Sequence, residues 1–223
     1  MLLAIDTSTR SIGLALYDGI RVVSEHTWWS QQYHTVELAP AIERLLGQSE
    51  SNIQDLKVIA VATGPGSFTG LRIGLALAKG IALAGHIDLV GIPTLDVLVA
   101  SQPLSDLRLA ALLQAGRGRL AVGWYHQSMG RWVQEGNCEI LDGHQLSERI
   151  TEPTWICGEL SESERRLLLR KRKNAKVASP AYCTRRPSFL AELGWQKWRE
   201  GYADDPATLV PTYLHFDGSI SVS

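Results

Sequence analysis

The sequence is poor in the residues that build disulfide frameworks and metal sites. Its three cysteines are far apart and form no Cys-x-x-Cys pair: Cys138, Cys157 and Cys183. This excludes a disulfide scaffold and a structural zinc site, and reduced thiols are typical of the cytoplasm. None of the six histidines stands four residues from another, the spacing that places two metal ligands on one helical face. We therefore expect no metal site and no metallopeptidase activity.

An excess of charge of one sign is also missing. The chain has 22 Lys and Arg against 23 Asp and Glu, so a global basic field for nucleic acid is excluded. The longest apolar stretch, residues 73–90, is interrupted by Lys79, His86 and Asp88, and no basic segment precedes the first apolar residues. We expect neither a signal peptide nor a membrane span, and a cytoplasmic location.

The first hundred residues follow a recognisable order of elements. The expected strands cover residues 2–6, 11–17, 20–28, 57–63 and 87–92, with helices that begin near Thr35, within a glycine turn and after Pro93. Three strands joined by hairpins therefore precede alternating helices and strands. This order predicts an α/β protein of the actin-like, sugar-kinase-like ATPase (ASKHA) fold.

The pattern of expected helices and strands changes beyond Ser101, where a second and smaller α/β lobe is expected. It contains a hairpin around residues 115–118, a helix opened by the capping box of Ser161 and Glu164, and a helix from Pro187 to Trp198. The expected organisation is a first lobe at 1–101, the smaller lobe at 102–203, and a tail at 204–223 that returns to the first lobe.

A glycine-rich turn leads directly into a helix over residues 64–83. Minimal side chains recur there at a spacing of four, along one helical face: Gly66, Gly70, Gly74, Ala78 and Ala82. Each interior glycine costs about 0.5–1 kcal/mol relative to alanine, so a reason for close approach is needed. Three explanations are open. The helix N-terminus binds an anion, a partner helix packs against this face of small residues (the glycine ridge), or the helix packs on its own sheet. If a partner packs there, Gly74→Leu should weaken association and leave the fold intact.

Asp6, Thr7, Ser8 and Thr9 follow the first strand, where this fold places its first phosphate loop. A carboxylate beside hydroxyls suits a metal-bound nucleotide phosphate, and it equally suits a β-turn satisfied by its own side chains. The hairpin at 114–119, expected to supply the second phosphate loop, has no carboxylate. A complete ATPase or kinase site is not visible, although an autonomous kinase of this fold stays open as an alternative.

The concentrated positive charge lies in one run: Arg170, Lys171, Arg172 and Lys173. Such a run contacts a nucleic-acid backbone or caps a solvated helix C-terminus, where cations are favoured by the helix dipole. Both readings are compatible with the sequence.

Several segments together resemble one family. These are the run from Leu3 to Ser8, the His34-Thr35 helix entry, the run Gly64-Pro65-Gly66-Ser67-Phe68-Thr69-Gly70-Leu71-Arg72-Ile73-Gly74, and Pro211-Thr212-Tyr213-Leu214. They resemble the bacterial TsaB (YeaZ) family of tRNA threonylcarbamoyladenosine biosynthesis proteins, strongly up to about residue 100. The chain departs from the family's pattern at Gln114-Ala115-Gly116, at Arg119 and at His215, which puts nucleotide chemistry in the second lobe in doubt.

The resemblance implies a noncatalytic scaffold. It would support the transferase TsaD, with the ATPase subunit TsaE, in modifying the tRNA adenosine 3′ of the anticodon. The metal-binding His-x-x-x-His of TsaD corresponds here to Thr94 and Leu98. The resemblance also implies pairing with TsaD, or self-association, through the first helix and the glycine-ridge helix. No intrinsic cofactor is expected, and ADP or ATP at a subunit junction stays open. The expected interface residues are His34, Leu38, Ile42, Gly66, Gly70, Leu71, Gly74, Ala78 and Ala82.

Overall fold

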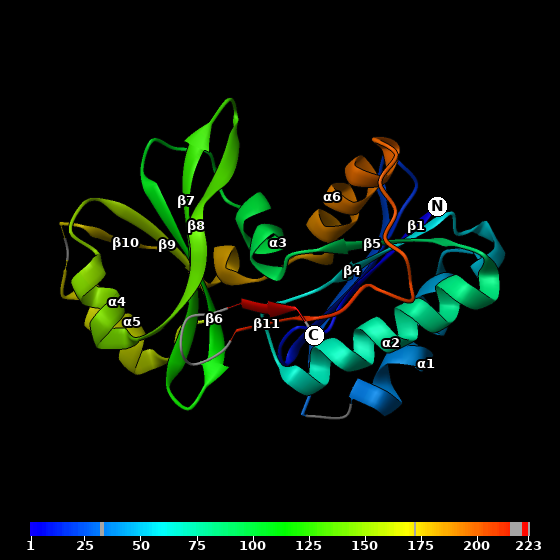
Figure 1. The fold of residues 1–223 in the computed structure, drawn as a ribbon, viewed down its shortest axis with the longest axis horizontal. Coiled ribbons are helices and arrows are strands. Elements are labelled where there is room, and N and C mark those ends of the chain that lie inside the picture. Colours follow the sequence, from blue (N-terminus) through cyan, green and yellow to red (C-terminus); the bar gives the residue numbers. More distant parts are fainter. Residues whose placement is uncertain (32–33, 172, 215–219, 223) are drawn as a thin grey trace. The chain divides into compact units, whose positions relative to one another are not determined.

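The structure is a computed structural model that describes residues 1–31, 34–171, 173–214 and 220–222. The chain forms two compact units (Figure 1). The first contains Met1–Val97 and Arg185–Thr212, the second contains Leu98–Thr184, and the C-terminal residues are divided between them.

The first unit is built on a mixed five-stranded sheet in the order β3-β2-β1-β4-β5. Its strands are β1 (Leu2–Asp6), β2 (Ser11–Tyr17), β3 (Val22–Trp29), β4 (Val58–Ala62) and β5 (Asp88–Ile92). The β1–β2 and β2–β3 pairs are antiparallel, whereas β1–β4 and β4–β5 are parallel. Every residue of β1 and β4 is buried because helices cover both faces of the sheet, which explains their continuous apolar sequences.

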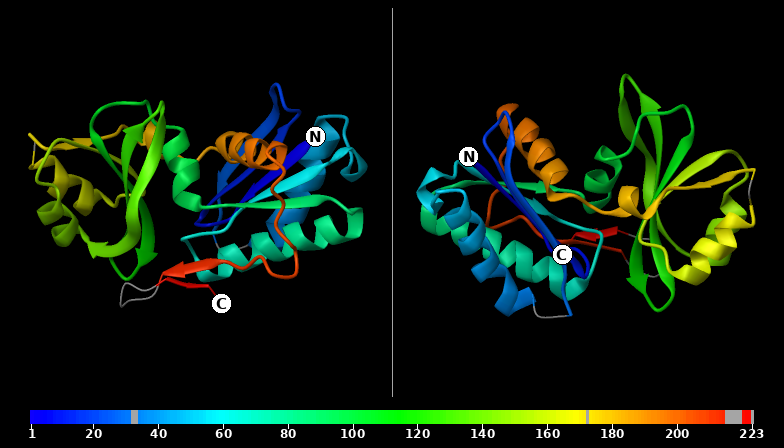
Figure 2. Two further views of the ribbon diagram at one scale, coloured as in Figure 1. Left: turned by 45° about the horizontal axis from the view of Figure 1, so that its top comes forward. Right: turned by 180° about the vertical axis from the view of Figure 1, so that it is seen from behind.

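Helices α1 (His34–Gln48) and α2 (Phe68–Gly85) cover one face of this sheet, and α6 (Pro187–Arg199) covers the other, as Figure 2 shows from two sides. The alternation along β1 divides the core accordingly: Leu3 and Ile5 belong to the cluster of α1 and α2, and Leu2 and Ala4 to that of α6. The 3-10 helix η1 (Ile53–Asp55) precedes β4, and α3 (Thr94–Ala100) follows β5.

Helix α2 is long and apolar enough to cross a membrane by length and composition alone, with a mean hydropathy of 1.3 and 33% of it buried. Its buried side contributes Leu75, Ala78 and Ala82 to the core over β1 and β4. Core helices of folded domains share this composition, so the helix is accounted for by its packing within the unit.

The second unit has its own mixed sheet in the order β10-β9-β6-β7-β8. Its elements are β6 (Arg108–Gly116), β7 (Arg119–Ser128), β8 (Arg131–Asp142), α4 (Gly143–Arg149), β9 (Thr154–Gly158), α5 (Glu162–Leu169), β10 (Ala175–Val177) and η2 (Pro180–Cys183). Helices α4 and α5 lie on one face, where Leu146 and Leu168 pack with Ile156 of the sheet. Strands β11 (Thr212–Leu214) and β12 (Ile220–Val222) form a separate ladder.

The predicted ASKHA order of elements is confirmed for the first hundred residues, and so is the capping box of Ser161 and Glu164 at the start of α5. Residues 185–203, assigned from the sequence to the second lobe, belong instead to the first unit because α6 packs on its sheet. The boundary falls at Val97 and Leu98, inside α3, and not after Ser101. Helix α5 ends at Leu169, before the basic run that was expected to close it.

The three free cysteines differ in burial, and this predicts different reactivity. Burial raises the pKa of the Cys138 thiol to about 12 and holds the pKa of Cys157 well above its ordinary value. Because the thiolate is the reactive form, a rise of this size lowers its fraction roughly a thousandfold near neutral pH. We expect a thiol reagent to modify Cys183 in the native protein and the other two only after unfolding. Rapid labelling of a Cys183→Ser variant would contradict this.

Candidate functional site

The loop after β1 is the first candidate, and its side chains are turned into the protein. Asp6, Thr7, Ser8 and Thr9 are all buried. The Ser8 N–H donates to Asp6 Oδ1 at 2.9 Å, which closes a turn on the aspartate itself. The Thr7 hydroxyl donates to the carbonyl oxygen of Gly70 at 2.8 Å. The second reading of this segment, a turn satisfied by its own side chains, is the one that the structure bears out.

Arg185 supplies the cation of this loop. Its Nε donates to Asp6 Oδ2 at 2.9 Å, and both side chains are only 2% exposed. Its terminal nitrogen donates to the Thr9 hydroxyl at 2.7 Å and to the Ser11 carbonyl oxygen at 3.3 Å. An internal guanidinium therefore stands against the carboxylate that was expected to face a metal-bound phosphate.

These residues do not fit a nucleotide phosphate, and the prediction that Asp6 to Thr9 bind one is corrected. A phosphate loop needs its hydroxyls and carboxylate open to the ligand, whereas here they are buried and bonded to one another. The Ser8 hydroxyl lies 2.8 Å from that of Thr94, which also accepts from the Gly64 N–H at 3.0 Å. The carboxylate is neutralised by Arg185, so no charge is left for a metal ion.

The glycine turn packs against this loop. Ser67 caps α2 by accepting from the Gly70 N–H at 3.2 Å, and its own N–H donates to the Ser8 carbonyl oxygen at 2.6 Å. A Cβ added at Gly70 would lie 2.2 Å from the Thr7 carbonyl oxygen, and one at Gly74 would lie 2.0 Å from the Thr7 hydroxyl. The close approach implied by the glycine spacing is made within the chain, to the loop after β1.

The predicted interface residues are therefore corrected. Most of them are buried inside the first unit, and Ile42 among these also borders a surface groove: Leu38, Ile42, Gly70, Leu71, Gly74, Ala78 and Ala82. Gly66 is half-buried, and a Cβ there would lie 2.3 Å from the Ser8 carbonyl oxygen. The side chain of His34 lies outside the described part of the chain. Spacing alone indicated a close contact and could not show which backbone makes it.

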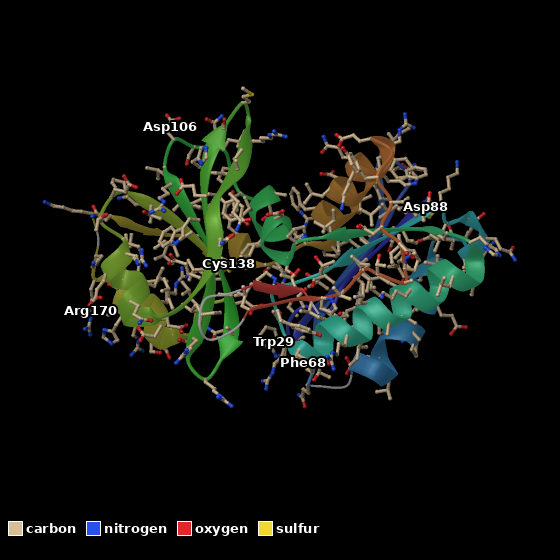
Figure 3. All side chains as sticks on the ribbon, viewed as in Figure 1. Trp29, Phe68, Asp88, Asp106, Cys138 and Arg170 are labelled. Carbon is tan, nitrogen blue, oxygen red and sulfur yellow. The ribbon has the colours of Figure 1, made fainter. Side chains whose placement is uncertain are left out.

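The opposite side of α2 is open. Phe68 and Leu83 are 54% and 64% exposed, and the small residues Ala76 and Gly80 lie between them on the exposed side. The Arg72 guanidinium stacks 3.7 Å from the centre of the Phe68 ring. We call these five residues the outward face of α2. Figure 3 shows Phe68 at the start of the helix.

A groove lies between α1 and α2, and Leu77 and Ile81 line it from α2. Its volume is about 740 Å³, and its lining is largely apolar: Ala39, Ile42, Glu43, Leu46, Gly47, Ser51, Asn52, Ile53, Gln54, Leu77 and Ile81. Val36, on α1, is a further exposed apolar side chain, at 66%. An apolar groove beside exposed apolar side chains is typical of a surface that a partner covers.

The positions that correspond to metal ligands hold none here. Thr94 Oγ1 is occupied by the hydrogen bonds described above, and Leu98 is an apolar, fully buried side chain. Over residues 1–31, 34–171, 173–214 and 220–222, no group of three or more His, Cys, Asp or Glu side chains is placed to hold a metal ion.

In the second unit, the hairpin expected to hold a phosphate is tied to α5. Gln114 Nε2 donates to Glu164 Oε2 at 2.9 Å and to the Glu159 carbonyl oxygen at 3.2 Å. The same Glu164 oxygen accepts from the Ser161 N–H at 2.7 Å. Gln114 thus joins the hairpin to the cap of α5.

The basic run directly follows α5 in the sequence of the second unit. Arg170, Lys171 and Lys173 line a hollow of about 510 Å³, and Arg170 is labelled in Figure 3. Arg172 lies outside the described residues. The structure therefore brings three of the four predicted nucleic-acid residues together.

Comparisons with known proteins agree with the architecture. Residues 27–138 match the family model "TsaD: tRNA N6-adenosine threonylcarbamoyltransferase". The chain is 32% identical over 218 residues to the tRNA threonylcarbamoyladenosine biosynthesis protein TsaB of Bacillus subtilis, a match that covers 96% of this chain and 93% of that protein.

Two solved structures show the same fold. YeaZ from Pseudomonas aeruginosa has a TM-score of 0.78 at 24% identity, covering 96% of this chain and 99% of that one. ROK hexokinase from Thermus thermophilus has a TM-score of 0.50 at 11% identity, covering 90% and 99%. The fold therefore defines an actin-like, sugar-kinase-like α/β protein, and in the loop after β1 Arg185 is paired with Asp6. Within this class the chain belongs to the TsaB (YeaZ) family, which confirms the resemblance seen in the sequence.

Proposed function

We propose that this chain takes part in forming threonylcarbamoyladenosine in tRNA, in the cytoplasm, as the noncatalytic partner of a TsaD-type transferase. Two comparisons support this role: the full-length similarity to a TsaB protein and the match of residues 27–138 to the TsaD model. In this proposal the partner performs the transfer, and a TsaE-type ATPase joins the pair.

The ion pair of Asp6 with Arg185 in the loop after β1 supports a noncatalytic role. Asp6 is neutralised by Arg185, and Thr94 and Leu98 offer no metal ligand at the positions that carry histidines in the transferase. The alternative of an autonomous kinase gains no observation in its favour, because the carboxylate it requires is committed to an ion pair. Any ADP or ATP in the assembly would be held at a junction between subunits.

The observation that carries the proposal is the outward face of α2 with the groove beside α1. Phe68 and Leu83 expose large apolar surfaces, and Ala76 and Gly80 between them let a partner helix come close. Of the five residues of this face only Arg72 is charged, and it is stacked on Phe68. We propose that an apolar helix face of the transferase covers this surface, and that a second copy of the chain covers it when the transferase is absent.

Replacing Leu83 with glutamate tests this contact. A carboxylate placed in an apolar interface would have to be desolvated without a partner, so affinity for the TsaD-type subunit should fall about a hundredfold. The melting temperature of the isolated chain should hardly change, since Leu83 is 64% exposed. Binding is measured by calorimetry, and threonylcarbamoyladenosine formation by the reconstituted subunits is followed in parallel.

The matched control is Leu104→Glu, which places the same charge at a leucine that is 53% exposed in the second unit. This variant should bind as the unmodified chain does. Equal losses for both variants, or unchanged binding of Leu83→Glu, would show that the transferase contacts another surface.

A further inference from the structure

The turn between α5 and β10 concentrates positive charge in a chain whose net charge is -1. Between Ser161 and Lys176 there are seven Lys and Arg against two Glu. A hollow of about 510 Å³ opens at this turn, and its lining contains no acidic residue: Ile150, Thr151, Arg170, Lys171, Lys173 and Asn174. We call these six residues the basic hollow.

Two cations of the basic hollow are free to bind. Within the described residues, the side chains of Arg170 and Lys173 make no hydrogen bond or ion pair. Both are exposed. By contrast, the Lys171 ammonium donates a hydrogen bond to the Ser147 carbonyl oxygen, which links Lys171 to α4.

Hydrogen bonds anchor Asn174, which lies next to Lys173. The Asn174 N–H donates to the Lys171 carbonyl oxygen at 3.0 Å, and its side-chain amide donates to the Thr151 carbonyl oxygen at 2.7 Å. The turn is therefore tied to the chain segment before β9 as well as to itself. Anchoring beside a cation reduces the conformational entropy that is lost when a ligand binds.

Arg170 also borders a second hollow, of about 650 Å³, which contains His144 and Arg166. Arg166 forms an ion pair with Glu162 there. Arg170 lines both hollows, and its side chain makes no hydrogen bond or ion pair within the described residues. Because Asp142 and Glu164 also line this second hollow, the uncompensated positive charge lies on the side of the basic hollow. Two unpaired cations at one hollow suit a ligand that carries more than one negative charge.

We propose that the basic hollow binds the phosphate backbone of RNA, so that this chain contacts the tRNA on which its complex acts. The inference rests on the proposed function for the identity of the RNA. A membrane surface fits less well, because the apolar side of α5 is buried in the core at Leu168 and leaves only Leu169, 48% exposed, next to the cations. Phosphate contacts fix position without reading sequence, so no base preference is expected from this surface.

The test replaces the two free cations, in the variant Arg170→Gln/Lys173→Gln. The full chain, alone and with its TsaD-type partner, is titrated with fluorescent tRNA at several salt concentrations. Losing two phosphate contacts should weaken binding about tenfold or more near 0.1 M salt and lower the slope of log K against log salt by about 1.5. Association with the TsaD-type subunit should not change, which separates this result from a failure of the proposed function.

Two controls sharpen the test. Arg131→Gln/Arg199→Gln removes the same charge from exposed positions that do not line the hollow and should leave tRNA affinity nearly unchanged. Arg170→Lys keeps the charge and should retain binding. The inference is overturned if the first control loses as much affinity as the test variant. The inference is also overturned if the test variant binds tRNA as tightly as the unmodified chain. If that variant instead loses binding to an acidic protein subunit, the hollow binds protein and not RNA.

Discussion

Replacing Arg185 with alanine should lower the free energy of unfolding by about 3–5 kcal/mol, the usual effect of leaving one partner of a buried ion pair without the other. Asp6 is 2% exposed and would keep its carboxylate in the core with no cation beside it. The Thr9 hydroxyl and the Ser11 carbonyl oxygen would each lose a donor as well. Urea unfolding followed by circular dichroism measures the change.

The neighbouring residue provides the control. Arg186 also forms an ion pair, with Glu25 at 2.6 Å, but its side chain is 56% exposed. Water screens such a pair, so Arg186→Ala should cost less than about 1 kcal/mol. The double variant Asp6→Leu/Arg185→Leu, which removes both charges, should recover much of the lost stability. Similar losses for Arg185→Ala and Arg186→Ala would mean that the buried pair contributes no more than a surface one.

Replacing Gly70 with alanine should destabilise the protein by about 3 kcal/mol, although alanine is the better helix former. Its Cβ would lie 2.2 Å from the Thr7 carbonyl oxygen, and that backbone cannot move without disturbing β1 and the Asp6 turn. The hydrogen bond from the Thr7 hydroxyl to the Gly70 carbonyl oxygen would be strained as well. Thermal melting of the isolated chain shows the effect.

Gly80, on the same helix, is the matched control. A Cβ there meets no atom within 4 Å, so Gly80→Ala should stabilise the helix by about 0.5–1 kcal/mol. The two Gly→Ala substitutions should therefore change the stability in opposite directions, and the difference would come from packing alone. The structure also reverses the expectation for Gly74→Leu: its side chain would meet Thr7, so folding should fail before association does. If Gly70→Ala melted at or above the unmodified temperature, the loop after β1 would have to lie farther from α2.

The fold was predictable where the signals were local. Alternating apolar strands, the capping box of Ser161 and Glu164, and the order of elements up to Pro93 each depend on residues close together in the chain. The place of α6 was not predictable in this way. Its apolar residues Leu190 and Ala191 pack on strands that lie 98 or more positions earlier in the chain. Their own spacing does not indicate which strands these are.

The same distinction separates the site residues. The glycine spacing at Gly70 and Gly74 correctly indicated close approach, but the approaching backbone is that of Thr7, 63 residues before Gly70. Arg185 was missed because it stands 179 residues from Asp6 and beside a second arginine that looks equivalent in the sequence. The outward face of α2 had a readable signal, since Phe68, Arg72, Ala76 and Gly80 also recur at a spacing of four.

Helix α2 thus presents two stripes with independent requirements. Changes at Phe68, Ala76 or Leu83 leave the packing of Gly70 and Gly74 on Thr7 untouched, because the two sets of side chains point in opposite directions. A gene copy that drifted away from its partner could therefore keep the whole glycine-rich signature and still fold. The glycine-rich signature therefore indicates family membership, whereas the outward face of α2 indicates whether the chain still binds a partner.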